Sequence, residues 1–141
     1  MKTSSMTVLF LLSVFATLNA QSQTTPNRHI LEAFSGAQIE SMSQNRIAYL
    51  NYISENAWEI IDIPEGKLEA DLPLLFRVDN DTKLTLTTAL NCDDLQSFNI
   101  LTFKYSIKAE RNYYKIEGCD KWLMIKSQKE ITEGFNEIQN N

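Results

Sequence analysis

Apolar residues recur at two different spacings along the chain, and each spacing predicts one type of secondary structure. Before residue 58, apolar positions three or four residues apart indicate amphipathic helices. Ser35 and Gln38 have the spacing of a capping box, and Ser43 can cap a second helix. We therefore expect a short helix over residues 36–42 and a longer one over 44–56. The apolar stripe of the longer helix consists of Ile47, Leu50, Ile53 and Ala57.

From residue 58 onward the spacing falls to two, which is typical of strands with one buried face. The first strand, over residues 58–63, ends at a turn-forming segment over residues 64–67. Two antiparallel hairpins are predicted after it, the first with one buried face and a threonine-rich face in water. The predicted strands of the two hairpins cover residues 72–78, 84–90, 101–108 and 113–117, and a last strand covers 122–126.

A further capping box, formed by Ser127 and Glu130, begins the C-terminal segment, where apolar residues again have helical spacing. Gly134 in the middle of this helix costs about 1 kcal/mol relative to alanine. The sequence therefore predicts an α+β fold. It comprises two short N-terminal helices, an antiparallel sheet of about five to six strands in sequential hairpins, and a short C-terminal helix.

The first twenty residues have a composition of their own. One lysine precedes the apolar residues 6–16, and a small residue, Ala20, stands before the polar sequence begins. This is the pattern of a secretory signal peptide, and so short an apolar stretch cannot span a bilayer, which takes about 20 residues. We expect cleavage after Ala20, a flexible leader over residues 21–28 and a single α+β domain over 29–141. The mature chain would be secreted or periplasmic and would not span the membrane.

Composition fits one small globular domain, since the chain has 141 residues, of which 43% are hydrophobic and 22% charged. The net charge of −5 argues against a nucleic-acid partner. An oxidising compartment favours a disulfide between the two cysteines, Cys92 and Cys119, which are 27 positions apart (119 − 92). Chain entropy gives such a bond about 3.5 kcal/mol. The alternative is a pair of buried free thiols.

Catalytic and metal-binding motifs are not found in the sequence, so no cofactor is expected. The single histidine, His29, lies at the margin of the predicted domain and is expected to be partly exposed. Aspartates that could attract calcium are equally typical of turns; they are Asp79, Asp81, Asp93 and Asp94. Carboxylates that could form a hydrolytic pair near the helices are Glu32, Glu40, Glu55 and Glu59.

Aromatic side chains offer a more specific hypothesis. Tyr113 and Tyr114 are adjacent on one predicted strand and must face opposite sides of it, and Trp122 begins the next strand. Amphipathic rings of this kind suit protein or sugar recognition. We take Tyr113, Tyr114 and Trp122 as a candidate binding surface.

Several segments resemble small secreted proteins of Bacteroidota-type bacteria, a group without an assigned function. The resemblance is carried by residues 18–21, 34–39, 50–52, 58–60, 113–116 and 121–125. It implies an exported small domain and brings no site residue with it.

These observations predict an exported, non-enzymatic domain that binds a protein or a cell-envelope component, as an accessory subunit or an inhibitor. The first alternative is a small envelope hydrolase that uses a carboxylate pair. A second is a purely structural envelope protein.

Overall fold

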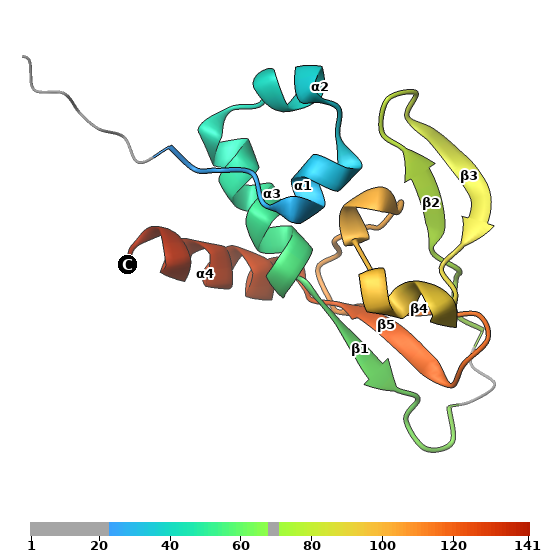
Figure 1. Ribbon diagram of the computed structural model, residues 1–141. Helices are drawn as coiled ribbons and strands as arrows, with labels where there is room; N and C mark the ends of the chain where they lie inside the picture. Colours follow the sequence, from blue (N-terminus) through green and yellow to red (C-terminus); the bar gives the residue numbers. More distant parts are fainter. Residues whose placement is uncertain (1–22, 68–70) are drawn as a thin grey trace, which may run out of the picture.

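The computed structural model describes residues 23–67 and 71–141, so the predicted signal peptide and its cleavage site lie outside the described residues (Figure 1). Three helices come first: α1 (Arg28–Ala33), α2 (Gly36–Glu40) and α3 (Gln44–Asn56). The strands are β1 (Trp58–Asp62), β2 (Phe76–Asp79), β3 (Leu84–Ala89), β4 (Asn112–Lys115) and β5 (Lys121–Ile125). Two 3₁₀ turns, η1 (Cys92–Ser97) and η2 (Ile100–Thr102), separate β3 from β4, and α4 (Gln128–Gln139) comes last.

The strands form two separate sheets. A three-stranded antiparallel sheet has the order β1-β5-β4, and β2 pairs with β3 in an antiparallel two-stranded ribbon. The predicted mixture of helix and sheet is confirmed, but the single sheet of five to six strands is not. In Figure 1 the ribbon lies on the opposite side of the molecule from α4. No helix in the described ranges has the length and apolarity needed to cross a bilayer.

The predicted helix starts are present in the structure. Ser35 and Gln38 form a capping box on α2, Ser43 caps α3, and Ser127 and Glu130 form a capping box on α4. Each cap gives a backbone N–H of the first helical turn an acceptor that it would otherwise lack. These local interactions explain why the spacing of polar residues alone located three helices.

Helix α1 is not among the predicted helices. It begins after Asn27, whose side chain accepts a hydrogen bond from the backbone N–H of Ile30 (3.1 Å). Residues 24–27, expected to belong to a flexible leader, instead lie along α3. There Asn51 accepts from the N–H of Asn27 (2.9 Å) and donates to the carbonyl of Thr25 (2.9 Å). The side chains of Asn27 and Asn51 satisfy the backbone that the composition suggested would be free.

The predicted strand over residues 101–108 is wrong. Its first residues belong to η2, and the remaining residues contact β2 at one isolated bridge, between Phe103 and Arg77. Burial still alternates, because Phe103 is buried, Tyr105 and Ile107 are half-buried, and the residues between them are exposed. The alternating pattern therefore set which side chains face the core, but no neighbouring strand is available to continue a ladder.

The first hairpin also differs from its prediction. Residues 84–88 are all exposed, and Leu84 and Leu86 keep 62% and 44% of their surface accessible. The register of the ribbon shifts between Phe76 and Val78, so β3 bulges away from β2. Burial resumes only at Ala89. The threonine-rich ribbon thus has no fully buried face along most of β3.

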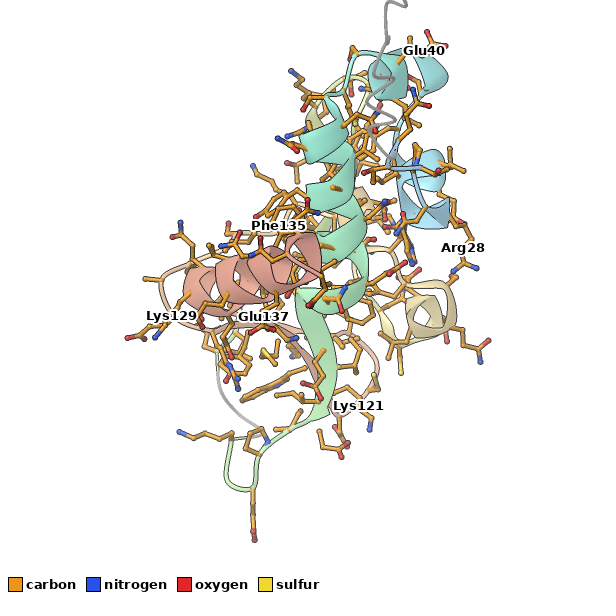
Figure 2. The ribbon with its side chains drawn as sticks, turned by 90° about the vertical axis from the view of Figure 1, so that its left-hand side faces the viewer. Arg28, Glu40, Lys121, Lys129, Phe135 and Glu137 are labelled. Carbon is orange, nitrogen blue, oxygen red and sulfur yellow. The ribbon has the colours of Figure 1, made fainter. Side chains whose placement is uncertain are left out.

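One hydrophobic core joins the helices to one face of the three-stranded sheet. Its fully buried side chains are Ile30, Ile53, Leu75, Leu90, Ile100, Ile116, Leu123, Ile125 and Ile131. Helix α4 crosses α3, and Phe135 points towards α3 (Figure 2). Its ring makes edge contacts with Tyr49 and Tyr52, at centroid distances of 5.4 and 5.7 Å.

Candidate functional site

An open groove of about 610 Å³ lies where α2, the start of α3 and the β2–β3 turn meet. Figure 1 shows this turn beside α2. The groove volume falls within the range of about 300–1,000 Å³ that is usual for ligand pockets. The residues that line the groove are Phe34, Gln38, Ser41, Met42, Ser43, Arg46, Asn80 and Lys83.

Gln38 connects the two sides of the groove. Its side-chain oxygen accepts the backbone N–H of Ser35 (2.9 Å), which completes the capping box of α2. Its side-chain nitrogen donates to the carbonyl of Asn80 in the β2–β3 turn (2.9 Å). One side chain therefore caps the start of α2 and holds the ribbon turn against it.

The β2–β3 turn is fixed by hydrogen bonds to other elements and within the turn. The side-chain nitrogen of Asn80 donates to the carbonyls of Ala33 (2.8 Å) and Leu101 (3.0 Å). The pKa of Asp79 is lowered, first by a hydrogen bond from the Thr82 side chain and then by backbone N–H groups of the same turn. Lys83 then adopts a positive φ of 58°. These contacts fix the backbone of the residue that directly precedes β3.

The charge of the groove is opposite to that of the whole protein. Arg46 and Lys83 line it, no acidic residue is among its lining residues, and the chain carries a net charge of −5. Neither cation takes part in an ion pair within the described ranges. Phe34 and Met42, both half-buried, supply apolar wall. The groove therefore favours a ligand that joins an anionic group to an apolar body.

The outer edge of β3 adjoins this groove through Lys83. Strand β3 pairs with β2 on one side, and no strand of the described chain pairs with its other side. Residues Leu84–Ala89 include no charged side chain. An edge strand that is exposed, uncharged and carries two exposed leucines can pair with another extended segment. The groove and the β3 edge together form the candidate site.

The three aromatic residues of the predicted binding surface lie elsewhere. Tyr114 and Trp122 are buried and Tyr113 is half-buried. The hydroxyl of Tyr114 accepts the backbone N–H of Ser106 (3.2 Å). Tyr113 and Trp122 pack together on the other face of the sheet, with ring centroids 6.0 Å apart. The three rings do not form one exposed patch, and their role in binding stays a prediction.

Cys92 and Cys119 lie close together, but the disulfide that the sequence analysis expected is not confirmed. They lie 2.5 Å apart as free cysteines, each half-buried. The backbone N–H of Cys92 donates to the carbonyl of Glu117 (2.8 Å), which holds η1 against the turn before β5. Burial raises the pKa of the Cys119 thiol to about 11, so this thiol is protonated at neutral pH.

Two of the remaining candidate carboxylates form ion pairs. Glu32 forms an ion pair with Arg28 (3.3 Å), and Asp94 forms one with Arg77 (2.5 Å). His29 is half-buried within α1, and its Nδ1 has no hydrogen-bond partner in the described part of the chain. Residues 23–67 and 71–141 contain no group of three or more His, Cys, Asp or Glu placed to hold a metal ion.

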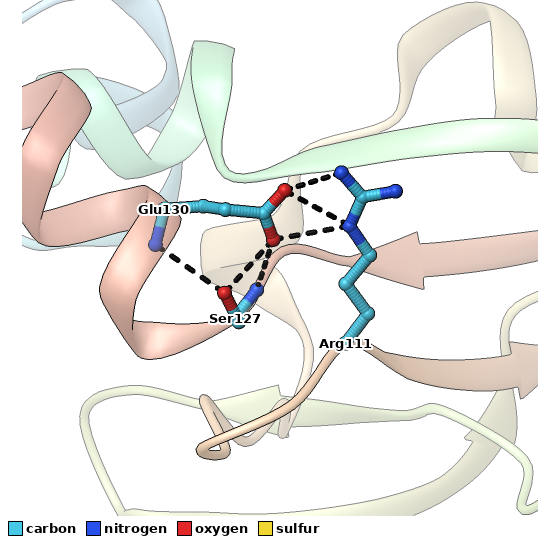
Figure 3. Close-up of polar contacts among 3 residues, drawn as sticks. All are labelled: Arg111, Ser127 and Glu130. Carbon is cyan, nitrogen blue, oxygen red and sulfur yellow. Dashed lines mark hydrogen bonds and ion pairs between the residues drawn. The ribbon is translucent and has the colours of Figure 1, made fainter.

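A bidentate pair fixes the start of α4 (Figure 3). The guanidinium of Arg111 donates through Nε to both carboxylate oxygens of Glu130 (2.9 and 3.0 Å) and through Nη2 to Oε1. Glu130 also accepts the backbone N–H and the hydroxyl of Ser127 (both 2.9 Å). These contacts, Arg111 first, lower the pKa of Glu130 to about 2. A lowered pKa is the opposite of what a general acid requires.

Sequence reasoning did not find the groove. Ser43 identified the helix start that places Arg46 three residues later, and turn residues preceded Lys83. Nothing in the local pattern showed that these two cations line one groove, because the groove forms where Gln38 contacts Asn80 across 42 positions of sequence.

Comparison with known proteins yields no match for this chain among protein-family models, curated proteins or solved structures.

Proposed function

We propose that this protein is an exported binding domain that contacts a partner protein through the outer edge of β3. The exposed Leu84 and Leu86 on this strand carry the proposal. Their burial against a partner would contribute about 25 cal/mol for each Å² of apolar surface removed from water. Unpaired backbone groups along the strand edge can also hydrogen-bond an added extended segment. Both contributions favour a protein partner.

Charge favours an extended segment with an acidic group over a second copy of this chain. Lys83, at the start of β3, and Arg46, beside it in the groove, attract a local negative charge. Two copies of this chain would each carry a net charge of −5 and repel one another. The proposed occupant of the β3 edge is therefore an acidic segment of a different protein.

The proposal includes export of the protein and oxidation of its two cysteines. Cleavage after Ala20 would release a chain of 121 residues (141 − 20) with a charge of −6, since Lys2 is removed. In an oxidising compartment Cys92 and Cys119 would form a disulfide. Each thiol gives up a proton and one electron to a disulfide-bonded oxidant, which is reduced to two thiols. This bond would link η1 to the turn before β5.

The test compares two double variants of the mature protein, each immobilised and exposed to an envelope extract of the source cells. Leu84→Gln with Leu86→Gln removes the exposed apolar surface of β3 without adding charge. Leu31→Gln with Ile138→Gln changes two residues of similar exposure, 61% and 57%, on α1 and α4. We expect the wild type and the control variant to retain the same protein from the extract in equal amounts. The β3 variant should not retain it.

Equal retention by all three proteins would contradict the proposal, as would loss with the α1/α4 variant alone. Sedimentation of the purified wild type provides the arm for self-association. A dimer that the β3 variant abolishes would show that the occupant is a second copy and would overturn the choice of a different protein.

A further inference from the structure

The cationic groove beside the β2–β3 turn indicates more about its ligand than a negative charge. It presents two positive side chains, Arg46 and Lys83, from two different elements, and both are exposed at its mouth. The charge of Arg46 also acts on Tyr105, where it opposes the burial that raises the pKa of this phenol to about 12. Two cations that line the groove, with no acidic residue among its lining, select a compact anion.

The rest of the groove is unsuited to a bare anion. Phe34 and Met42 line it as half-buried apolar side chains that pack against the edge of the core. Inorganic phosphate would leave this apolar wall in contact with water. The last residue of a peptide chain carries its carboxylate and its side chain on the same carbon atom. An apolar C-terminal residue therefore matches both halves of the groove.

The groove is also held in place before a ligand binds. Gln38 joins α2 to the ribbon turn, and Asn80 joins the same turn to the carbonyls of Ala33 and Leu101. Because these contacts already order the turn, a ligand does not bear the entropic cost of forming the site. A fixed site suits recognition of a chain end, which offers few atoms for contact.

We propose that this groove binds the C-terminal carboxylate of a partner protein whose last side chain is apolar. The inference rests on the proposed function, because it identifies the acidic group of the partner segment. The carboxylate lies between Arg46 and Lys83, and the last side chain contacts Phe34 and Met42. The residues before it leave the groove along the edge of β3.

The probe is the dipeptide acetyl-Gly-Leu as the free acid, titrated into the ¹⁵N-labelled mature protein and followed by backbone NMR shifts. We expect saturable shifts at the amides of Arg46 and Lys83. Acetyl-Gly-Leu-amide should bind at least 10-fold more weakly, because it lacks the charge. Inorganic phosphate should also bind more weakly than the free acid, because it cannot contact the apolar wall.

Three variants locate the site. Arg46→Gln and Lys83→Asn should each weaken binding of the free acid at least fivefold, and asparagine tolerates the positive φ at position 83. Lys129→Gln, which removes the same charge from α4, should leave binding unchanged. An unchanged backbone spectrum outside the groove shows that each variant is folded.

Equal binding of acid and amide, tighter binding of phosphate, or shifts outside the groove would each overturn the inference. A dipeptide is too short to pair along β3, so the uncharged double variant Leu84→Gln with Leu86→Gln should bind it like the wild type. If the free acid does not bind while that double variant still loses its protein partner, the proposed function stands and the C-terminal carboxylate is wrong.

Discussion

Replacing Gly134 with alanine tests how α4 packs on α3. A Cβ atom at this position would lie 2.1 Å from the Tyr52 hydroxyl oxygen and 3.1 Å from its Cζ. The Tyr52 ring is only 8% exposed and contacts Phe135, so it cannot swing freely into water. Alanine gains about 1 kcal/mol of helix propensity. Overpacking costs about 1–3 kcal/mol. We therefore expect Gly134→Ala to lower the free energy of unfolding by about 0–2 kcal/mol.

Urea unfolding followed by tryptophan fluorescence measures this change, and two further variants isolate its cause. Tyr52→Phe removes the hydroxyl, so Gly134→Ala should cost less in that background, with a coupling on the order of 1–2 kcal/mol. Gly36→Ala is the control, because a Cβ there meets nothing within 4 Å. The reasoning is refuted if Gly134→Ala stabilises the protein by about 1 kcal/mol, or if its effect is the same in both backgrounds.

Two further predictions concern polar contacts. The pKa of Glu130 is lowered from 4.5 to about 2, so its stabilising contacts are fully present above pH 4.5 and are lost as pH falls towards 2. Glu130→Gln should therefore reduce the dependence of the free energy of unfolding on pH between 4.5 and 2, as measured by urea unfolding at several pH values. The same pH dependence in the variant and the wild type would contradict this. Oxidation of Cys92 and Cys119 to a disulfide should raise the free energy of unfolding by about 3.5 kcal/mol. Cys92→Ser should abolish the difference between oxidised and reduced samples, and a redox-sensitive midpoint in that variant would count against the pair.

The sequence predicts those parts of the fold that depend on neighbouring residues. Capping boxes such as Ser127 with Glu130 act over three positions, so their spacing is visible in the chain. Strand pairing is not local. The alternation around Phe103 correctly indicated which side chains are buried, but the pattern contains no information on whether a partner strand lies beside them.

The candidate site could not be predicted from the sequence for the same reason. Arg46 and Lys83 are ordinary surface cations in the sequence, and they line one groove because long-range hydrogen bonds of Gln38 and Asn80 hold the β2–β3 turn in place. The aromatic residues that seemed more informative, Tyr114 and Trp122 among them, are largely packed inside the protein. Composition alone does not separate rings that bind from rings that fill a core.

Hydrogen exchange of the backbone amides of β3 tests the central claim most directly. The amides of β3 that do not face β2 have no partner strand in the described chain, so their exchange should be fast in the isolated protein. In a complex with the partner protein, we expect these amides and that of Lys83 to be protected, with α4 unchanged. Protection confined to α4 or to the three-stranded sheet, with β3 still exchanging freely, would contradict the account.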